Sequence, residues 1–362
     1  MSGKKYCIGG YQVPSVSVVV PVYNVEKFLG ECLDSLVNQT LKDIEVICVN
    51  DGSTDSCGEI LNEYASRDSR IRVINKKNTG YGDSVNAGIA SATADYVGIV
   101  ESDDFVDDDM FADLHACIVK RGCDVVKSNF YRYFGQTKEI IALGNTLKNL
   151  DEGKISSVEA KNALLRAFPA IWANIYRKDF LIENGIQLLD TPGASYQDAS
   201  FHFKVISLAK NIYTTHRPYV YYRQDNANQS TVRMDGAFFH FIEYAEIDRF
   251  LNAHPDLKKF YSAAKFERQY GTYRWCLNRI SRKLRRDVFE RIHCDFKNYY
   301  NSGELTDDVL KNLNKRFEKP SVMELITVPK KAWRHFEIKV SSIKRILQQV
   351  AAEKSAQDSR LT

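Results

Sequence analysis

The sequence lacks the features that mark secreted, membrane-spanning or zinc-finger proteins. Its eight cysteines are scattered without a C-x-x-C pair, so neither a disulfide framework nor a zinc site is expected. Several lie inside apolar segments, which indicates buried free thiols in a reducing compartment. No apolar run is long enough to span a bilayer, and residues 1–7 lack the apolar core of a secretory signal. We therefore expect a cytoplasmic protein.

The sequence also lacks internal repeats and low-complexity tracts. Its 362 residues predict one large domain with an appendage, or two domains. Charge is distributed unevenly, because residues 1–240 carry 25 Lys and Arg against 30 Asp and Glu, whereas residues 241–362 carry 25 against 16. A mildly acidic first part and a basic second part predict two separate roles.

The first 130 residues alternate between short β-branched runs and segments of helical spacing. We expect strands at 15–20, 43–49, 71–75, 96–100 and 124–130, and helices at 26–38, 55–67 (with Asp55 as its N-cap), 83–92, 108–120 and 157–168. This alternation predicts an α/β fold with a parallel sheet covered by helices on both faces. Residues 135–155 suggest a surface insertion, and the pattern becomes almost wholly helical after residue 235.

An acidic quartet, Glu101-Ser102-Asp103-Asp104, follows the strand predicted at 96–100, and we expect Glu101 still to belong to that strand. Acids stacked where a buried strand ends repel one another and resist desolvation. A divalent cation removes that conflict and takes its other ligands from substrate phosphates. The alternative is a solvated acidic turn before a helix, which explains the following Asp107–Asp109 well and Glu101 poorly.

Two earlier strands also end in polar groups on the same expected rim of the sheet, where ligands bind in open α/β folds. The first ends in Pro21-Val22-Tyr23-Asn24 and the second in Asn50-Asp51-Gly52-Ser53. An aromatic face at Tyr23 and an acceptor at Asp51 suit a nucleobase and its ribose, although a simple tight turn is the alternative for Asp51. The glycine-containing turn at 76–82 can present amide groups to an anion, but it matches neither G-x-G-x-x-G nor a P-loop.

These motifs, in this order and spacing, resemble family-2 glycosyltransferases, which are inverting enzymes of the Rossmann-like GT-A fold that use nucleotide-sugar donors. The resemblance is close over residues 15–130, looser to residue 230, and absent from the helical tail. It implies a mixed, mostly parallel sheet flanked by helices in a catalytic domain at 1–235, followed by a basic, mainly helical region at 236–362.

The resemblance also implies roles for individual residues. The nucleotide-sugar would be held by Pro21, Tyr23, Asn24, Asp51, Asn78, Gly80, Ser102 and Asp103, with Asp51 facing the base. Asp103 and Asp104 would bind Mn²⁺ or Mg²⁺ bridged to the donor diphosphate. The family commonly has Asp where this chain has Glu101, so Glu101 is expected either to ligate the metal or to bond a metal-bound water or the sugar.

Asp198 matches the catalytic base of the family, and Gln197 stands where the family often has a further acid. A carboxylate is needed because an acceptor hydroxyl is a poor nucleophile until its proton is removed. Without the resemblance, a helix cap is the simpler interpretation of Asp198. Arg223 is the candidate for a phosphate contact, with a surface arginine beside a strand as the alternative. His202 and Trp172 are expected to be structural.

The basic tail interleaves Lys and Arg with aromatic and aliphatic residues at 274–292 and 330–349. Such helices suit the anionic face of a membrane, and the resemblance favours peripheral attachment at the inner face of the plasma membrane. A bundle with a solvated basic face is the alternative, and no nucleic-acid module accompanies the charge.

The sequence as a whole predicts an inverting glycosyltransferase. We expect it to transfer a sugar from a nucleotide-sugar to a hydroxyl of a glycan or lipid-linked acceptor in bacterial surface polysaccharide synthesis. A UDP-sugar is the expected donor. A nucleotidyltransferase is one rival, although the Gly-rich phosphate loop expected near its N-terminus is missing. A non-catalytic nucleotide-sugar-binding relative is the other.

Overall fold

The computed structural model describes residues 7–8, 11–135, 139–142, 150, 152–194, 196–226, 238–280 and 282–316. Its strands are β1 (Cys7–Ile8), β2 (Tyr11–Gln12), β3 (Val16–Val22), β4 (Ile44–Asn50), β5 (Ile71–Asn75), β6 (Tyr96–Ile99), β7 (Phe105–Val106), β8 (Val125–Phe134), β9 (Glu139–Ala142), β10 (Gly153–Ile155), β11 (Asn174–Arg177) and β12 (Ile212–Arg223). Its helices are α1 (Glu26–Val37), α2 (Cys57–Arg67), α3 (Tyr81–Ser91), α4 (Met110–Arg121), α5 (Val158–Arg166), η1 (Ile171–Ala173), α6 (Lys178–Glu183), α7 (Asp198–Leu208), α8 (Phe239–Ala253), α9 (Pro255–Arg279), α10 (Arg282–Asn301) and α11 (Asp307–Arg316).

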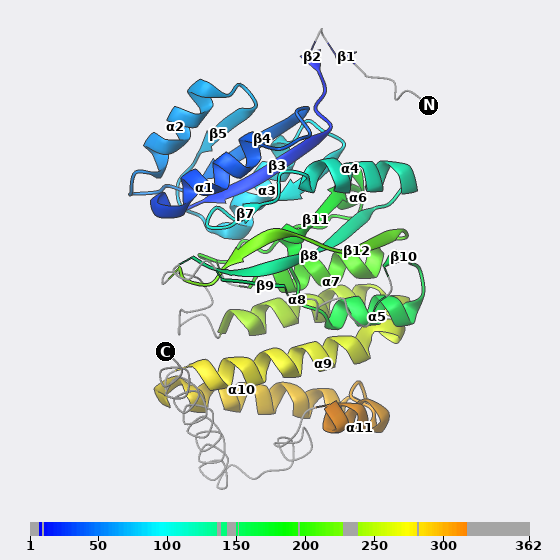
Figure 1. Cartoon of the computed structure of the whole chain (residues 1–362). Helices are drawn as coiled ribbons and strands as arrows, with labels where there is room; N and C mark the ends of the chain where they lie inside the picture. The colour runs from blue at the N-terminus through cyan, green and yellow to red at the C-terminus, as the bar shows by residue number, and fades with distance from the viewer. Residues whose placement is uncertain are drawn as a thin grey trace, which may run out of the picture. The chain divides into compact units, whose positions relative to one another are not determined.

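A mixed sheet forms the centre of the fold, with the order β10-β12-β8-β11-β6-β3-β4-β5 (Figure 1). The ladders that join β6, β3, β4 and β5 are parallel. β11 runs antiparallel between β6 and β8, and β12 then pairs with β8 in a long parallel ladder. Most paired residues therefore lie in parallel ladders, and the predicted mixed α/β sheet flanked by helices is confirmed.

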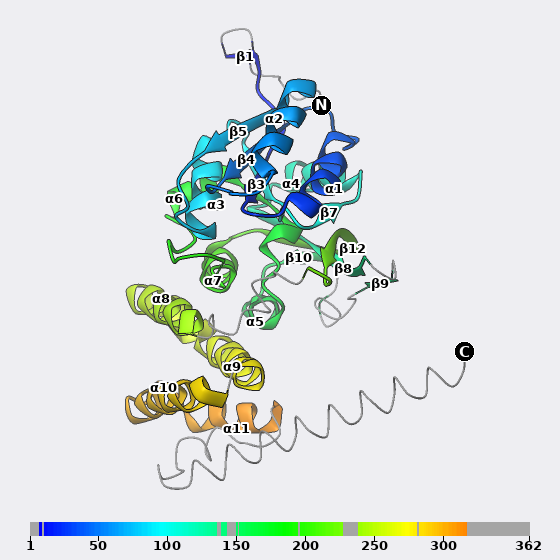
Figure 2. The same ribbon diagram turned by 90° about the vertical axis from the view of Figure 1, so that its left-hand side faces the viewer.

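The strand order reverses between β3 and β6. The chain moves outward from β3 through β4 to β5 and then returns to the other side of β3 as β6. Because parallel crossovers are right-handed, this reversal places α3 on the face opposite α1. Figure 2 shows β3 and β4 between these two helices. A reversal of this kind opens a crevice at the carboxyl ends of the strands, where ligands bind.

The predicted elements of the first 130 residues are present, with ends shifted by a few residues. One shift matters for the site: the prediction that Glu101 belongs to its strand was wrong, because β6 ends at Ile99. The Val100 N–H still bonds Val19 of β3 at 3.0 Å, and the Asp104 N–H then donates to the Glu101 carbonyl at 3.0 Å. The acidic quartet therefore lies in a turn that follows β6 and is not part of the sheet.

Asp55 lies one residue before the N-cap position of α2, which Ser56 occupies. Its carboxylate accepts the N–H of Cys57, at the start of α2, at 3.1 Å. The other carboxylate oxygen accepts the N–H of Glu26, at the start of α1, at 3.0 Å. In return, the Glu26 side chain accepts the Ser56 N–H at 2.9 Å. The predicted acid therefore satisfies the exposed amides of two helices.

The chain divides into two compact units, residues 1–233 with 241–261, and residues 234–240 with 262–362. The sheet and α8 from Phe241 onward lie in the first unit. In the second, aromatic side chains form the contact between α9 and α10, with the rings of Tyr270 and Phe296 centred 5.6 Å apart. None of the helices described for this chain is both long enough and apolar enough to cross a bilayer. The basic segment at 330–349 lies outside the described residues.

The segment expected to be a surface insertion, 135–155, is described only in part. Residues 139–142 form β9, which pairs with β8, and residues 153–155 form β10, which pairs with β12. The described parts of this segment therefore extend the sheet.

Candidate active site

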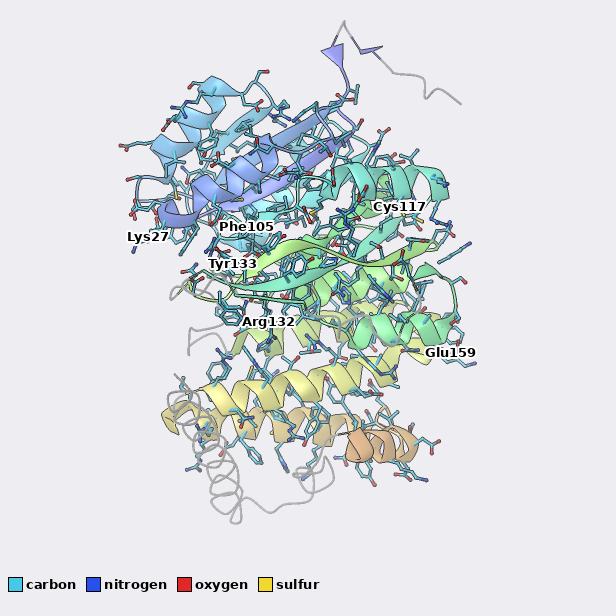
Figure 3. All side chains as sticks on the ribbon, in the orientation of Figure 1. Lys27, Phe105, Cys117, Arg132, Tyr133 and Glu159 are labelled. Carbon is cyan, nitrogen blue, oxygen red and sulfur yellow. The ribbon has the colours of Figure 1, made fainter. Side chains whose placement is uncertain are left out.

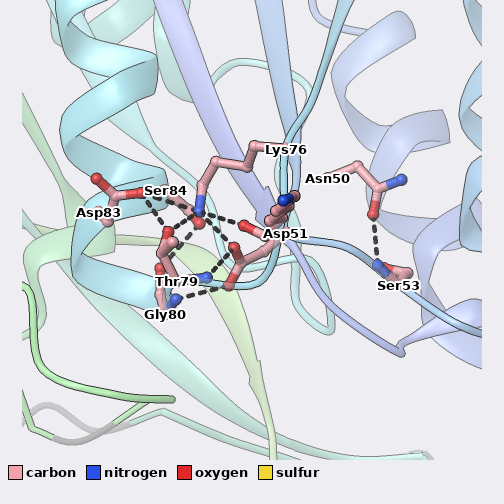
Figure 4. Close-up of polar contacts among 9 residues, drawn as sticks. Asn50, Asp51, Ser53, Lys76, Thr79, Gly80, Asp83 and Ser84 are labelled. Atoms are coloured by element: carbon pink, nitrogen blue, oxygen red, sulfur yellow. Dashed lines mark hydrogen bonds and ion pairs between the residues drawn. The ribbon is translucent and has the colours of Figure 1, made fainter.

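The first part of the site is a polar network around Asp51, directly after β4 (Figure 4). Its two carboxylate oxygens accept the backbone N–H groups of Thr79 and Gly80, each at 2.9 Å. The Lys76 ammonium contacts the same carboxylate and also bonds Asp83 at 2.9 Å. An acceptor and a cationic donor therefore lie side by side at the end of β4 and β5.

This network depends on a tight turn at Gly52. The residue has φ +69°, a conformation that side-chain-bearing residues rarely adopt. A Cβ at this position would lie 2.9 Å from the backbone nitrogen of Asn78. The loop after β4 thus approaches the 76–80 turn so closely that only glycine fits at position 52. Asn78 itself is exposed, and Gly80 is buried.

The end of β3 supplies the neighbouring wall. Pro21 is buried within the strand, and Tyr23 has 47% of its surface exposed. Asn24 adopts φ +52°, and its side-chain oxygen accepts the N–H of Thr54 at 2.8 Å. An exposed tyrosine therefore directly precedes Asn24, whose side chain contacts the loop after Asp51.

Asp104 is the most buried member of the acidic quartet, with 1% of its surface exposed. One of its carboxylate oxygens accepts the Arg223 N–H at 2.8 Å. The other oxygen is buried and has no hydrogen-bond partner among the described residues. Burial, and then the nearby charge of Asp103, raise the pKa of Asp104 well above its ordinary value. The site thus holds a buried acceptor that an added cation could satisfy.

Asp103 lies beside it, and its carboxylate accepts a hydrogen bond from the side-chain amide of Asn226 at 2.8 Å. Burial raises the pKa of Asp103 as well. Ser102 is buried and separates Asp103 from Glu101. No group of three or more His, Cys, Asp or Glu side chains in the described part of the chain is arranged to enclose a metal. Any metal held here would need further ligands from outside the protein.

Glu101 has a partner that the sequence did not suggest. The Tyr81 hydroxyl donates to its carboxylate at 2.5 Å. Burial raises the pKa of Glu101 to about 8, and the charges of Asp103 and Asp198 act in the same direction, whereas the bond from Tyr81 opposes the rise. Tyr81 is the first residue of α3, directly after Gly80, so one hydrogen bond joins the end of the 76–80 turn to the acidic quartet.

Arg223 is buried, with 5% of its surface exposed, and its guanidinium is surrounded by the protein. It donates to the Asp103 carbonyl at 2.8 Å and pairs with Glu31. It also lies over aromatic rings, including those of Phe105 and Tyr133, which Figure 3 shows close together. Through these contacts, Arg223 stabilises the turn that carries Asp103 and Asp104. The predicted phosphate contact stays a prediction.

Asp198 is the first residue of α7 and is partly exposed. Its charge raises the pKa values of Glu101, Tyr81 and Tyr222, so the fold brings it into the same cluster as the acidic quartet, from nearly a hundred residues away. The preceding Gln197 is buried, and its amide donates to the Gly193 carbonyl at 3.0 Å. Gln197 therefore fixes the 191–193 loop.

Three residues of this cluster were missed by sequence reasoning: Lys76, Tyr81 and Tyr222. Lys76 and Tyr81 lie within the turn at 76–82, and Tyr222 directly precedes Arg223, but none has a spacing of its own that signals a role. His202 and Trp172 are buried, as expected of structural residues. The His202 ring contacts the Leu164 carbonyl at 3.1 Å, and the Trp172 ring packs on Phe130 at 4.7 Å.

The fold and site together define an α/β domain with a carboxylate cluster at its switch point. Comparison with known proteins makes this class more specific. Residues 17–180 match the model of the family described as "Glycosyl transferase family 2". The match confirms the resemblance seen in the sequence: residues 17–180 form a glycosyltransferase family 2 domain.

Several curated relatives are glycosyltransferases. "Uncharacterized glycosyltransferase EpsJ" of Bacillus subtilis is 34% identical over 225 residues, which cover 60% of this chain and 63% of that protein. "Glycosyltransferase GlyA" of Streptococcus pneumoniae is 42% identical over 118 residues, which cover 33% of this chain and 17% of that protein. The chain thus spans less than two thirds of the length of these relatives.

A solved structure confirms the fold over most of the chain. The crystal structure of S. aureus TarS 1-349 superposes with a TM-score of 0.65 over 89% of this chain and 91% of that chain, at 19% sequence identity. At that identity the likeness concerns the fold alone. It confirms the predicted GT-A architecture, including a helical region after the sheet.

Proposed function

We propose that this chain is a metal-dependent, inverting glycosyltransferase. It transfers a sugar from a UDP-sugar to a hydroxyl of a glycan or lipid-linked acceptor in bacterial surface polysaccharide synthesis. The observation that carries the proposal is the convergence of the Asp51 network, the acidic quartet and Asp198 at the point where strand order reverses. The family 2 domain and the relatives named as glycosyltransferases support it.

The nucleotide end of the donor would lie against β3 and β4. The carboxylate of Asp51 offers an acceptor and the ammonium of Lys76 a donor, side by side. Uracil presents an N–H beside a carbonyl and would be complementary to that pair, while the exposed Tyr23 ring supplies a stacking surface. A structural neighbour, TarS, has been solved with UDP and with UDP-GlcNAc, which supports a uridine nucleotide here.

The acidic quartet fits a divalent metal. The buried, unpartnered oxygen of Asp104 and the neighbouring carboxylate of Asp103 are the hard oxygen donors that Mg²⁺ and Mn²⁺ prefer. When bound, the metal would neutralise charge on the departing diphosphate. Arg223 would keep both carboxylates in place through its backbone N–H and its bond to the Asp103 carbonyl.

Asp198 would act as the general base. Its carboxylate would take the proton from the acceptor hydroxyl while that oxygen attacks the anomeric carbon and the bond from that carbon to the diphosphate breaks. The proton ends on Asp198, the electron pair of the broken bond ends on UDP, and the anomeric configuration inverts. Glu101, held by Tyr81, would contact the sugar.

We also propose that the enzyme works in the cytoplasm at the inner face of the plasma membrane, attached through its basic C-terminal helices. Arg286 and Arg291 of α10 are largely exposed. Such positive charges are attracted by anionic lipids. A lipid-linked acceptor would be presented at that surface.

The test begins with thermal shift against a panel of nucleotide-sugars with Mn²⁺, since ligand binding raises stability by mass action. UDP release is then measured for the best donor. We expect Asp198→Asn to lower UDP release by roughly 100-fold or more, as the loss of a general base does, while the donor-induced shift survives. Asp307→Asn, at the first position of α11, is the matched helix-start control.

The outcomes separate the rival functions. Full activity of Asp198→Asn would remove the base assignment. Pyrophosphate release in place of UDP release would identify a nucleotidyltransferase, and donor binding without any release would identify a non-catalytic relative. We expect EDTA, or Asp104→Asn, to weaken donor binding; an unchanged shift would remove the metal assignment.

A further inference from the structure

We propose that Glu243 of α8 is a positioning residue for Asp198, because it holds the first turn of α7. The inference rests on the proposed function only in taking Asp198 as the base. Glu243 lies outside the matched family segment of 17–180 and outside the motifs of the sequence. The mechanism above does not use it.

A side chain of α8 accepts a hydrogen bond from the first turn of α7. Asp198, Ala199 and Ser200 open α7, so their N–H groups have no acceptor within the helix. Gln197, at the N-cap position, makes no side-chain cap, since its amide is engaged with the 191–193 loop. The Glu243 carboxyl instead accepts the Ser200 N–H at 3.0 Å. An acid of α8 therefore replaces the missing cap of α7.

A second contact fixes the same pair of helices. The Lys204 ammonium, one turn after Ser200, pairs with Glu246, one turn after Glu243, at 2.6 Å. Both side chains are 9% exposed. Two buried polar contacts, a turn apart on both helices, define the register of α7 on α8. A shift of that register would move Asp198 relative to the acidic quartet.

The protonation of Glu243 suggests an informative substitution. It is fully buried, and one of its oxygens has no hydrogen-bond partner among the described residues. Burial raises the pKa of Glu243 to about 7, and the charge of Asp198 acts in the same direction, whereas the bond from the Ser200 N–H and the charge of Lys204 oppose the rise. Below that pH the group is a neutral acid, which glutamine imitates in shape and can replace as the acceptor of the Ser200 N–H.

The test compares Glu243→Gln, Glu243→Leu and Ile247→Ala in the full chain. Ile247 is a buried residue of α8, so its truncation destabilises the helix without removing the contact to Ser200. Hydrogen exchange of the first turn of α7 is measured without ligand. UDP release from UDP-N-acetylglucosamine with Mn²⁺, or from the best donor of the panel, is measured at pH 6.5.

We expect Glu243→Leu to speed exchange in the first turn of α7 and to lower kcat by roughly 10- to 100-fold, because small misplacements of a reacting group cost that much. KM for the donor should stay unchanged. Glu243→Gln should restore both readouts to within about twofold of wild type. Ile247→Ala should lower Tm but keep kcat.

Unchanged exchange in Glu243→Leu would overturn the proposal, and so would faster exchange with an unchanged kcat, or an equal loss of kcat in Ile247→Ala. A wild-type protein that releases no UDP from any donor would instead count against the proposed function, while faster exchange in Glu243→Leu would still support the hold on α7.

Discussion

At the scale of single residues, Lys127 shows how strongly burial can change a charge. It lies on β8 with 2% of its surface exposed. Its ammonium contacts two neutral oxygens, the Ala170 carbonyl at 3.2 Å and the Asn174 side chain at 3.4 Å. Burial lowers the pKa of Lys127 to about 7. The folded protein therefore holds this lysine neutral above that pH.

This lysine predicts a specific pH dependence of stability. Between pH 7 and the ordinary lysine pKa of about 10.4, the unfolded chain binds the proton and the folded chain does not, so this group makes the folded state more stable as pH rises. We expect the Tm of wild type, measured relative to Lys127→Met, to be higher at pH 9.5 than at pH 6.5. The same comparison for the exposed Lys154→Met should be flat; a flat Lys127 comparison would show that the lysine is solvated.

The sequence predicted which acids lie near one another in the fold, because their chemistry and their positions at the ends of elements point to one edge of the sheet. Asp103, Asp104 and Asp198 were expected to share a site, and the fold does bring them into one cluster. The bond between Tyr81 and Glu101 could not be predicted, because it depends on how closely α3 approaches the end of β6. The same holds for Glu243, since its partner Ser200 is 43 residues away on another helix.

At the scale of elements, the segment after α6 is held against α3 by very close contacts. The side chain of Asn86 donates to the Leu188 carbonyl at 2.9 Å and accepts the Leu188 N–H at 3.0 Å. A Cβ on Gly82 would lie 2.1 Å from the Leu189 carbonyl oxygen. Because α3 begins with Tyr81, this packing also fixes the start of the helix that carries the partner of Glu101.

We therefore expect Asn86→Ala to destabilise the protein by about 1–3 kcal/mol, since it leaves two backbone groups without partners. Urea unfolding measures this loss. Asn184→Ala, which removes the bond from the exposed residue Asn184 to the Phe180 carbonyl, is the matched control and should cost less than about 0.5 kcal/mol. Equal losses would show that the Asn86 bonds contribute little.

Strands and helices of the first 130 residues were predictable because each buries one clear face or runs through the core. Every residue of β3 is buried, which is the pattern of a central parallel strand. The insertion of β11 between β6 and β8 was not predictable. Its four residues carry no periodicity that distinguishes an antiparallel neighbour from a parallel one.

At the scale of the whole molecule, the two parts of the sequence differ in net charge. The basic excess lies in residues 241–362, and α10 presents part of it. If this charge binds membranes, vesicle binding should fall with salt, because exposed charges are screened beyond about 8 Å at physiological ionic strength.

The corresponding variant is the triple substitution of Arg279, Arg286 and Arg291 by Glu. We expect at least a tenfold loss of cosedimentation with phosphatidylserine vesicles, since each basic residue contributes about 1 kcal/mol near such a surface. A control triple of Lys27, Lys120 and Lys154, all exposed residues of the first unit, should bind as wild type. An equal loss of vesicle binding in the two triple variants would show that binding depends on the net charge of the protein and not on the C-terminal helices.

The double role of Asp55 has a consequence for how the sheet's outer layer opens. Its carboxylate accepts the first amides of both α1 and α2, so neither helix start can fray without disturbing the other. Two helices of successive β–α units thus depend on the same carboxylate for the hydrogen bonds of their first turns. In native-state exchange their first turns would open as a single cooperative foldon, although about 30 residues of chain separate them.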